Sequence, residues 1–204
     1  MTGSKYVDFA TVVATQVPTN TQIANTCRDH LRLSLAWTAR HLEAGASKEC
    51  EILLKGSYGA AVEAVSLVSF GLIRPAILSL RSHYELNLQY LFYKDHPIEW
   101  RNVLAFRAQP NLPGVNKKFL RENYSLFEER LKKLSAVRAR SNEDCYGVLS
   151  GVAHGTAINS ISTATEPKEL VEAQETVAHS GSVFLDVGEN ISDIHVACFE
   201  SNWL

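Results

Sequence analysis

The sequence predicts an all-α fold of about six helices, built as one domain over residues 1–204 around a long central third helix. Apolar residues recur every three or four positions along most of the chain, which is the period of a helix with one buried face. Capping residues, prolines and glycines stand near the ends of these periodic segments. No alternating run of apolar and polar residues is long enough to form a sheet.

The first predicted helix runs from about residue 20 to residue 43 and follows an N-terminal extension over residues 1–18. Thr19 and Gln22 have the spacing of a capping box, in which the two side chains satisfy free backbone amides at a helix start. Pro18 directly precedes this pair. We therefore expect the helix to begin after Pro18.

The next helical stretch contains Gly56-Ser57-Tyr58-Gly59, which predicts a kink or break. The third helix then begins near Pro75, a residue that fits best in the first turn, and stops at His96 before a short helix over 98–106. Its apolar residues occupy several faces, so other helices should surround it. The main apolar stripe consists of Ile73, Ile77, Leu80, Tyr84, Leu88 and Leu91.

In the second half of the chain, two prolines and a glycine predict a loop over 109–116. The fourth major helix then carries an apolar face from Leu120 to Leu134, and a fifth spans about 142–159. Residues 160–166 form a predicted linker before a C-terminal helical region, which Gly181 should divide.

Composition favours a cytoplasmic globular protein. Hydrophobic residues make up 46% of the chain and charged residues 21%, as is usual for globular domains. No uninterrupted apolar run approaches the ~18 residues of a membrane span, and the first 17 residues lack the features of a signal peptide. The four cysteines are far apart, which indicates free thiols in a reducing compartment. They are Cys27, Cys50, Cys145 and Cys198.

The charge distribution is uneven although the net charge is only −2. Residues 116–140 carry a net charge of +5, and residues 141–204 carry −9. These two regions can attract each other, either within one subunit or between two. The alternative is that they are simply two oppositely charged, solvated faces.

The third helix carries the first candidate site. Arg81 and Glu85 are four residues apart, so they share one helix face and lie one turn from each other. Arg74 and Gln89 extend the same stripe as candidate binding residues. Because the helix is apolar on several faces, this ion pair should be partly buried, and a buried ion pair is weak evidence for stability. A functional or interface role and a structural role are both open.

The predicted fifth helix contains Gly147, Gly151 and Gly155 at four-residue intervals, with Ser141 and Asp144 as capping residues. Each helical glycine costs roughly 1 kcal/mol relative to alanine, so three of them need a reason. We expect this glycine ridge to pack closely against the third helix and bring the Arg81 stripe near the fifth helix.

Tyr146, Ser150 and His154 line up beside the ridge, again at four-residue intervals. Two hydroxyls and an imidazole in one row could form a polar groove. Imidazole is the side chain whose ordinary pKa lies near neutrality, so His154 is the best general acid–base candidate. The alternative is a structural histidine bonded to a backbone carbonyl. The sequence offers no metal-binding motif and no phosphate loop, so we expect no metal and no cofactor.

The segment from Ala61 to Ala76, followed by Arg81 and Glu85, resembles a group of bacterial proteins in the HEPN-like superfamily. In that group a glycine-broken helix pair carries Arg-x-x-x-Glu and a later helix carries Tyr-x-x-x-Ser-x-x-x-His. Both features occur here, the second ending at His154. The resemblance covers about half of the chain.

This resemblance implies a helical bundle that pairs as a homodimer. Many HEPN relatives cut RNA as toxins or phage-defence effectors, and others are inactive binding partners. Catalytic members carry an arginine and a histidine with four to six residues between them, a spacing that is absent here. Two hypotheses follow. In the first, Arg81 binds a phosphate of RNA or a nucleotide and His154 is the acid–base group of a metal-independent ribonuclease. In the second, the chain is a non-catalytic dimerisation or interaction module.

Overall fold

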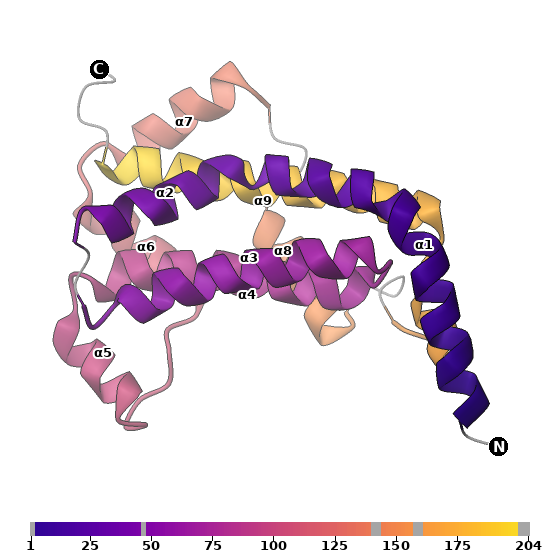
Figure 1. Cartoon of the computed structure of the whole chain (residues 1–204). Coiled ribbons are helices and arrows are strands. Elements are labelled where there is room, and N and C mark those ends of the chain that lie inside the picture. Colours follow the sequence, from indigo (N-terminus) through magenta and orange to yellow (C-terminus); the bar gives the residue numbers. More distant parts are fainter. Residues whose placement is uncertain (1–2, 46–47, 140–143, 157–160, 200–204) are drawn as a thin grey trace.

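The computed structural model describes residues 3–45, 48–139, 144–156 and 161–199, which form nine α-helices and contain no strand (Figure 1). This confirms the all-α class, whereas the predicted number of about six helices is too small. The α-helices are α1 (Gly3–His30), α2 (Arg32–Glu43), α3 (Glu51–Ser69), α4 (Ile73–Tyr93), α5 (Pro97–Leu104), α6 (Pro113–Asn123), α7 (Phe127–Val137), α8 (Cys145–His154) and α9 (Gln174–Phe199), and η2 is a 3-10 helix (Pro167–Leu170).

The helix α4, the predicted third helix, packs against α3, α5, α6, α8 and α9. It has this many neighbours because its apolar side chains point in several directions around the axis. In Figure 1, α2 and the second half of α1 run alongside α9, and α3 and α4 run beneath them. The hydrophobic core lies between these layers, and Leu80, Tyr84 and Leu91 of α4 are completely buried in it.

The predicted helix start after Pro18 and the Thr19 capping box are wrong, because α1 already begins at Gly3 and contains Pro18 in its interior. Threonine hydroxyls in this segment donate to the carbonyl four residues earlier, as Thr21 Oγ1 does to Val17 O at 2.7 Å. Such back-bonding lets a threonine sit inside a helix rather than cap one. The chain instead breaks at Leu31, which is completely buried.

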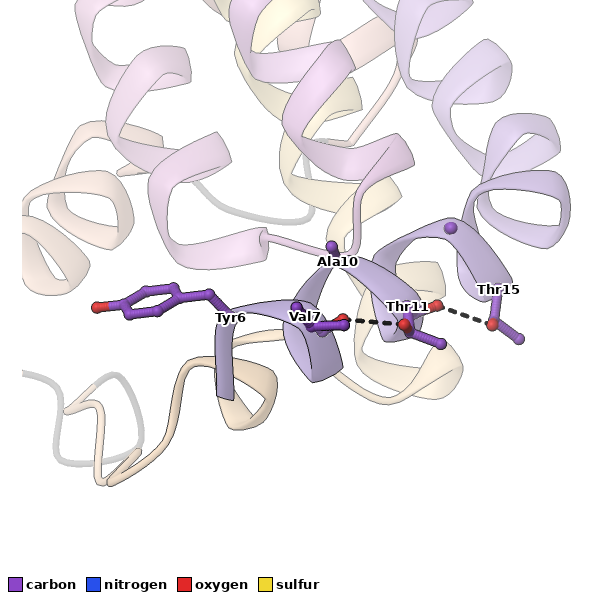
Figure 2. A pocket seen from close by; sticks show the side chains of 6 residues that line it. Tyr6, Val7, Ala10, Thr11 and Thr15 are labelled. Atoms are coloured by element: carbon purple, nitrogen blue, oxygen red, sulfur yellow. Dashed lines mark hydrogen bonds between the residues drawn. The ribbon is translucent and has the colours of Figure 1, made fainter. Parts of the chain in front are cut away.

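The first half of α1 extends past the end of the bundle and packs on η2 (Figure 1). Lys5 Nζ lies 3.1 Å from Glu166 Oε1. Figure 2 shows the outer face of this arm, a shallow hollow lined by uncharged residues. The Thr11 hydroxyl there donates to Val7 O at 2.9 Å, and the Thr15 hydroxyl donates to Thr11 O at 2.8 Å. These hydroxyls are therefore already engaged by their own helix.

Two glycines that should interrupt helices lie within continuous ones. The helix α3 passes through Gly56, where an added Cβ would lie 3.3 Å from Leu86 Cδ1 of α4, so the missing side chain allows close packing of α3 on α4. The helix α9 passes through Gly181, whose carbonyl accepts a hydrogen bond from His30 Nδ1 at 2.9 Å. The predicted break in α3 and the predicted division of α9 are therefore wrong, and contacts with neighbouring helices surround both glycines.

The predicted fourth helix is two helices, because Leu126 adopts a left-handed backbone conformation with φ of 62° between α6 and α7. The predicted loop over 109–116 is too long, since α6 already begins at Pro113. The predicted fifth helix extends into residues 140–143 and 157–160, which lie outside the described residues. Residues 161–166 contain no helix, as the predicted linker requires.

The oppositely charged regions contact each other within the chain. The helix α7 packs on α9, and Arg138 just after α7 forms an ion pair with the nearly buried Glu189 of α9. Arg130 Nη1 donates to Ala197 O at 2.8 Å. All four cysteine thiols are free. Among the described helices, α3 alone is long and apolar enough to cross a membrane, and a third of the apolar window that qualifies it is buried.

Candidate functional site

The structure brings together four of the predicted site residues from α4 and α8. Arg81 Nε donates to Glu85 Oε1 at 2.7 Å, and Arg81 Nη2 donates to the Tyr146 hydroxyl at 3.1 Å. The Tyr146 hydroxyl in turn donates to Glu85 Oε1 at 3.1 Å, which closes a triangle of hydrogen bonds. Arg81 Nη1 lies 3.3 Å from His154 Nε2. We call these residues, Arg81, Glu85, Tyr146 and His154, the Arg81 cluster.

Local sequence fixes the position of α8 relative to α4. Asp144 caps the helix, and its Oδ1 accepts from Gly147 N at 3.0 Å, as its predicted capping role requires. Cys145 and Leu149 are buried on the inner face of α8. Tyr146 stacks on the buried Tyr84 of α4 with ring centroids 6.0 Å apart. This packing directs the Tyr146 hydroxyl toward the ion pair.

Two of the three ridge glycines, Gly147 and Gly155, do not make the predicted contact with α4. Gly155 lies outside the helix as its C-cap, with φ of 61°, a conformation that favours glycine. A Cβ added at Gly147 would meet the side chain of the capping Asp144, not a residue of α4. Helices α4 and α8 do pack together. Tyr146 fills part of this contact with a large side chain, because it stacks on Tyr84 of α4.

The Arg81 cluster is partly shielded from water and is open on one side. The side chains of Arg81 and Glu85 are 18% and 26% exposed, whereas His154 is exposed. Burial by itself would lower the pKa of Arg81, but the hydrogen bond and charge of Glu85 raise it. Burial raises the pKa of Tyr146, and the charge of Glu85 adds to this effect. At neutral pH the cluster therefore contains a guanidinium cation, a protonated phenol and an accessible imidazole.

Three predicted residues lie outside this hydrogen-bonded group. Ser150 is half-buried on α8 between Tyr146 and His154, and among the described residues no hydrogen bond joins its hydroxyl to the cluster. Gln89 is half-buried one turn beyond Glu85. Arg74 lines a separate cavity of about 520 Å³, together with residues of α1, η2 and the segment 161–164.

The described core also holds a chain of buried polar side chains that the sequence analysis missed. We call it the histidine network. His41 Nε2 lies 3.1 Å from His195 Nδ1, and His195 Nε2 lies 3.2 Å from Asn87 Oδ1. Asn87 Nδ2 donates to Ser57 Oγ at 2.6 Å. His83 Nδ1 lies 2.9 Å from the Ser57 carbonyl, and His83 Nε2 lies 3.0 Å from Ser34 Oγ.

The partners in this network determine the tautomers of the histidines. Because carbonyl and amide oxygens only accept, His83 Nδ1 and His195 Nε2 carry the protons. His195 Nδ1 is then an acceptor, so His41 donates to it through Nε2. Each of these rings can make its hydrogen bonds while neutral. Burial lowers the pKa of His83 and of His41 to about 4 each, and it lowers the pKa of the completely buried His195 well below the ordinary value of 6.5.

The network draws its side chains from α2, α3, α4 and α9. Aromatic rings cover its outer end, where Trp37 stacks on His195 at a centroid distance of 5.4 Å and Tyr90 lies 5.0 Å from His41. One signal for the network was present in the sequence. Ser57, His83 and Asn87 are polar residues on otherwise apolar helix faces, a position that predicts a satisfied buried network.

No group of three or more histidine, cysteine, aspartate or glutamate side chains in the described part of the chain is arranged to hold a metal ion. Neither a protein-family model, nor a curated protein, nor a solved structure matches this chain. The functional interpretation therefore depends on the geometry of the residues.

Proposed function

We propose that this chain is a cytoplasmic, HEPN-like helical protein that acts on RNA or a nucleotide as a homodimer in bacterial defence or a toxin system. The observation that carries the proposal is the 3.3 Å contact between the guanidinium of Arg81 and the exposed imidazole of His154. A cation and a candidate acid–base group are adjacent and reachable from solvent. Phosphoryl chemistry needs both of these parts.

In the proposed mechanism, Arg81 holds a phosphate through its planar set of N–H donors. Each of the three guanidinium nitrogens already has a partner. Together they carry five N–H groups, so further donors remain for a ligand. Glu85 and Tyr146 fix the plane of the guanidinium from the side opposite His154. The bound phosphate first displaces the His154 imidazole from Arg81. His154 then takes the proton of an attacking 2′-hydroxyl or gives a proton to the leaving oxygen.

A second hypothesis is a non-catalytic helical dimerisation or interaction module. Glu85, Tyr146 and His154 each contact a different nitrogen of Arg81, so the same cluster can serve as a clamp between α4 and α8. In that case the polar side chains stabilise the helix packing and bind nothing.

The two hypotheses differ in what His154→Ala and Arg81→Ala should do. If the cluster acts on RNA, His154→Ala lowers cleavage by ~10²–10⁴-fold and leaves the melting temperature nearly unchanged, because His154 is exposed. Arg81→Ala also abolishes cleavage. Arg81→Lys tests whether the planar guanidinium donors are needed, since lysine keeps the positive charge but lacks these donors. His179→Ala on the exposed face of α9 is the matched control and should leave cleavage intact.

The clamp hypothesis makes the opposite prediction. Arg81→Ala then lowers the melting temperature, although by less than the ~3–5 kcal/mol of a fully buried pair, because Glu85 retains 26% of its side-chain exposure. If purified wild-type protein cuts no RNA and binds no nucleotide, and Arg81→Ala loses this stability, the proposed activity is refuted and the clamp hypothesis is supported.

A further inference from the structure

The outward face of α3 is apolar and uncovered. Ile52, Tyr58 and Val62 are 59%, 50% and 51% exposed, and Phe70 at the end of the helix is 40% exposed. By length and composition, the same helix could cross a membrane. Only a third of the apolar stretch that meets this criterion is buried within the chain. Large apolar side chains gathered on one helix face mark an interaction surface.

This face has a regular arrangement of ridges. Lys55, Gly59 and Glu63 follow each other at four-residue intervals and form one exposed ridge along the helix. Tyr58, Val62 and Ser66 form the next ridge. At the centre of the first ridge, a Cβ added to Gly59 would find no atom within 4 Å. The ridge therefore has a low point in its middle, where another backbone can approach closely.

Two copies of the first ridge have complementary charges when they run in opposite directions. Lys55 lies four residues before Gly59, and Glu63 lies four residues after it. If two copies of α3 cross in opposite directions with Gly59 against Gly59, Lys55 of each copy faces Glu63 of the other. A two-fold axis makes this contact twice, because the same patch is used on both subunits.

Helix geometry permits this arrangement. Ridges of residues spaced by four pack into the matching grooves of a neighbouring helix at a crossing angle of about −50°, the commonest class in globular proteins. In such a crossing the Tyr58–Val62 ridge lies beside the ridge of the second copy and is removed from water. Lys55 already pairs with Glu51 at 2.7 Å in the same chain, and at 62% side-chain exposure it is free to reach a second carboxylate.

We propose that a second copy of this chain docks on the α3 face and forms an antiparallel α3–α3 dimer around a two-fold axis at Gly59. The inference rests on the homodimer of the proposed function and names its surface. It does not depend on the chemistry of the Arg81 cluster.

A charge exchange tests this surface. Lys55→Glu and Glu63→Lys each place like charges opposite each other at two symmetric positions, so each should weaken the dimer at least about tenfold in Kd by sedimentation equilibrium. The double variant Lys55→Glu/Glu63→Lys restores opposite charges and should return Kd to within about threefold of wild type. Lys118→Glu is the control, since Lys118 also pairs with an exposed glutamate one turn away, at 3.8 Å, but on α6. It should leave Kd unchanged.

A steric variant tests the centre of the contact independently. Gly59→Leu adds a side chain that has space in the single chain, so the far-UV circular dichroism spectrum should not change while the dimer dissociates. A wild-type protein that is monomeric at micromolar concentration would overturn the dimer and its surface together. A dimer that is indifferent to all three α3 changes would overturn the surface alone.

Two further outcomes distinguish a dimer surface on α3 from a membrane-binding face and from the proposed RNA activity. If the wild type is monomeric but binds phosphatidylglycerol vesicles, and Val62→Glu abolishes this binding, the face contacts membrane and the dimer is refuted. If the charge exchange behaves as expected in a protein that cuts no RNA, the α3 surface is supported and only the proposed RNA activity is refuted.

Discussion

Acidification should destabilise this fold through the histidine network. His83 is completely buried, and burial lowers its pKa from 6.5 to about 4. In the unfolded chain the same imidazole binds its proton near pH 6.5, so between these values the unfolded state holds more protons than the folded one. Stability therefore rises with pH in this window, and the contribution of His83 is lost as pH falls from about 6.5 toward 4.

The size of the effect follows from the shift in pKa. A change from about pH 7.5 to about pH 4.5 should lower the unfolding free energy by roughly 2–3 kcal/mol through His83 alone. His41 has a similarly lowered pKa and contacts His195 directly, so the three rings titrate as a coupled group and their contributions do not simply add. The total loss should nevertheless exceed that of a single ring.

Urea unfolding followed by tryptophan fluorescence at several pH values measures this effect, with Trp37 stacked on His195 as an internal reporter. His83→Gln should be less stable at pH 7 because it loses network hydrogen bonds, but its stability should depend less on pH between about 4.5 and 7.5. His179→Gln, at an exposed position, should keep the wild-type slope. If His83→Gln does not fold, His41→Gln at the half-buried end gives the same comparison. An unchanged pH slope in the network variants would show that the buried histidines are not the titrating groups.

Three helix positions give further tests by thermal unfolding. Gly188→Ala should destabilise the protein by ~1–3 kcal/mol, because its Cβ would lie 3.1 Å from the His30 carbonyl carbon and even closer to the carbonyl oxygen. Gly181→Ala in the same helix, with no atom nearer than 3.9 Å, should be neutral or stabilising by up to ~1 kcal/mol, and equal effects would contradict this packing. Asp144→Ala should cost ~1 kcal/mol by removing the cap on Gly147 N, and Asp144→Asn should retain most of that stability.

The alignment of the candidate site residues could be predicted from the sequence because it is local. Arg81 and Glu85 share a face in any helix, as do Tyr146 and His154 over two turns, since 3.6 residues complete each turn. The capping role of Asp144 is equally local. Which faces of the two helices meet is not local, so the sequence did not show that Gly147 and Gly155 lie away from α4.

The sequence by itself determined the helical class, the central helix α4 and the polar stripes that α4 and α8 carry. Tertiary structure decided where the helices begin and end: α1 continues through Pro18, and α9 continues through Gly181. It also created the histidine network, in which His41 contacts His195 across 154 residues of the chain. The physical reason is that helix periodicity follows from backbone geometry within a few residues, whereas burial and hydrogen-bond partners depend on how whole helices pack.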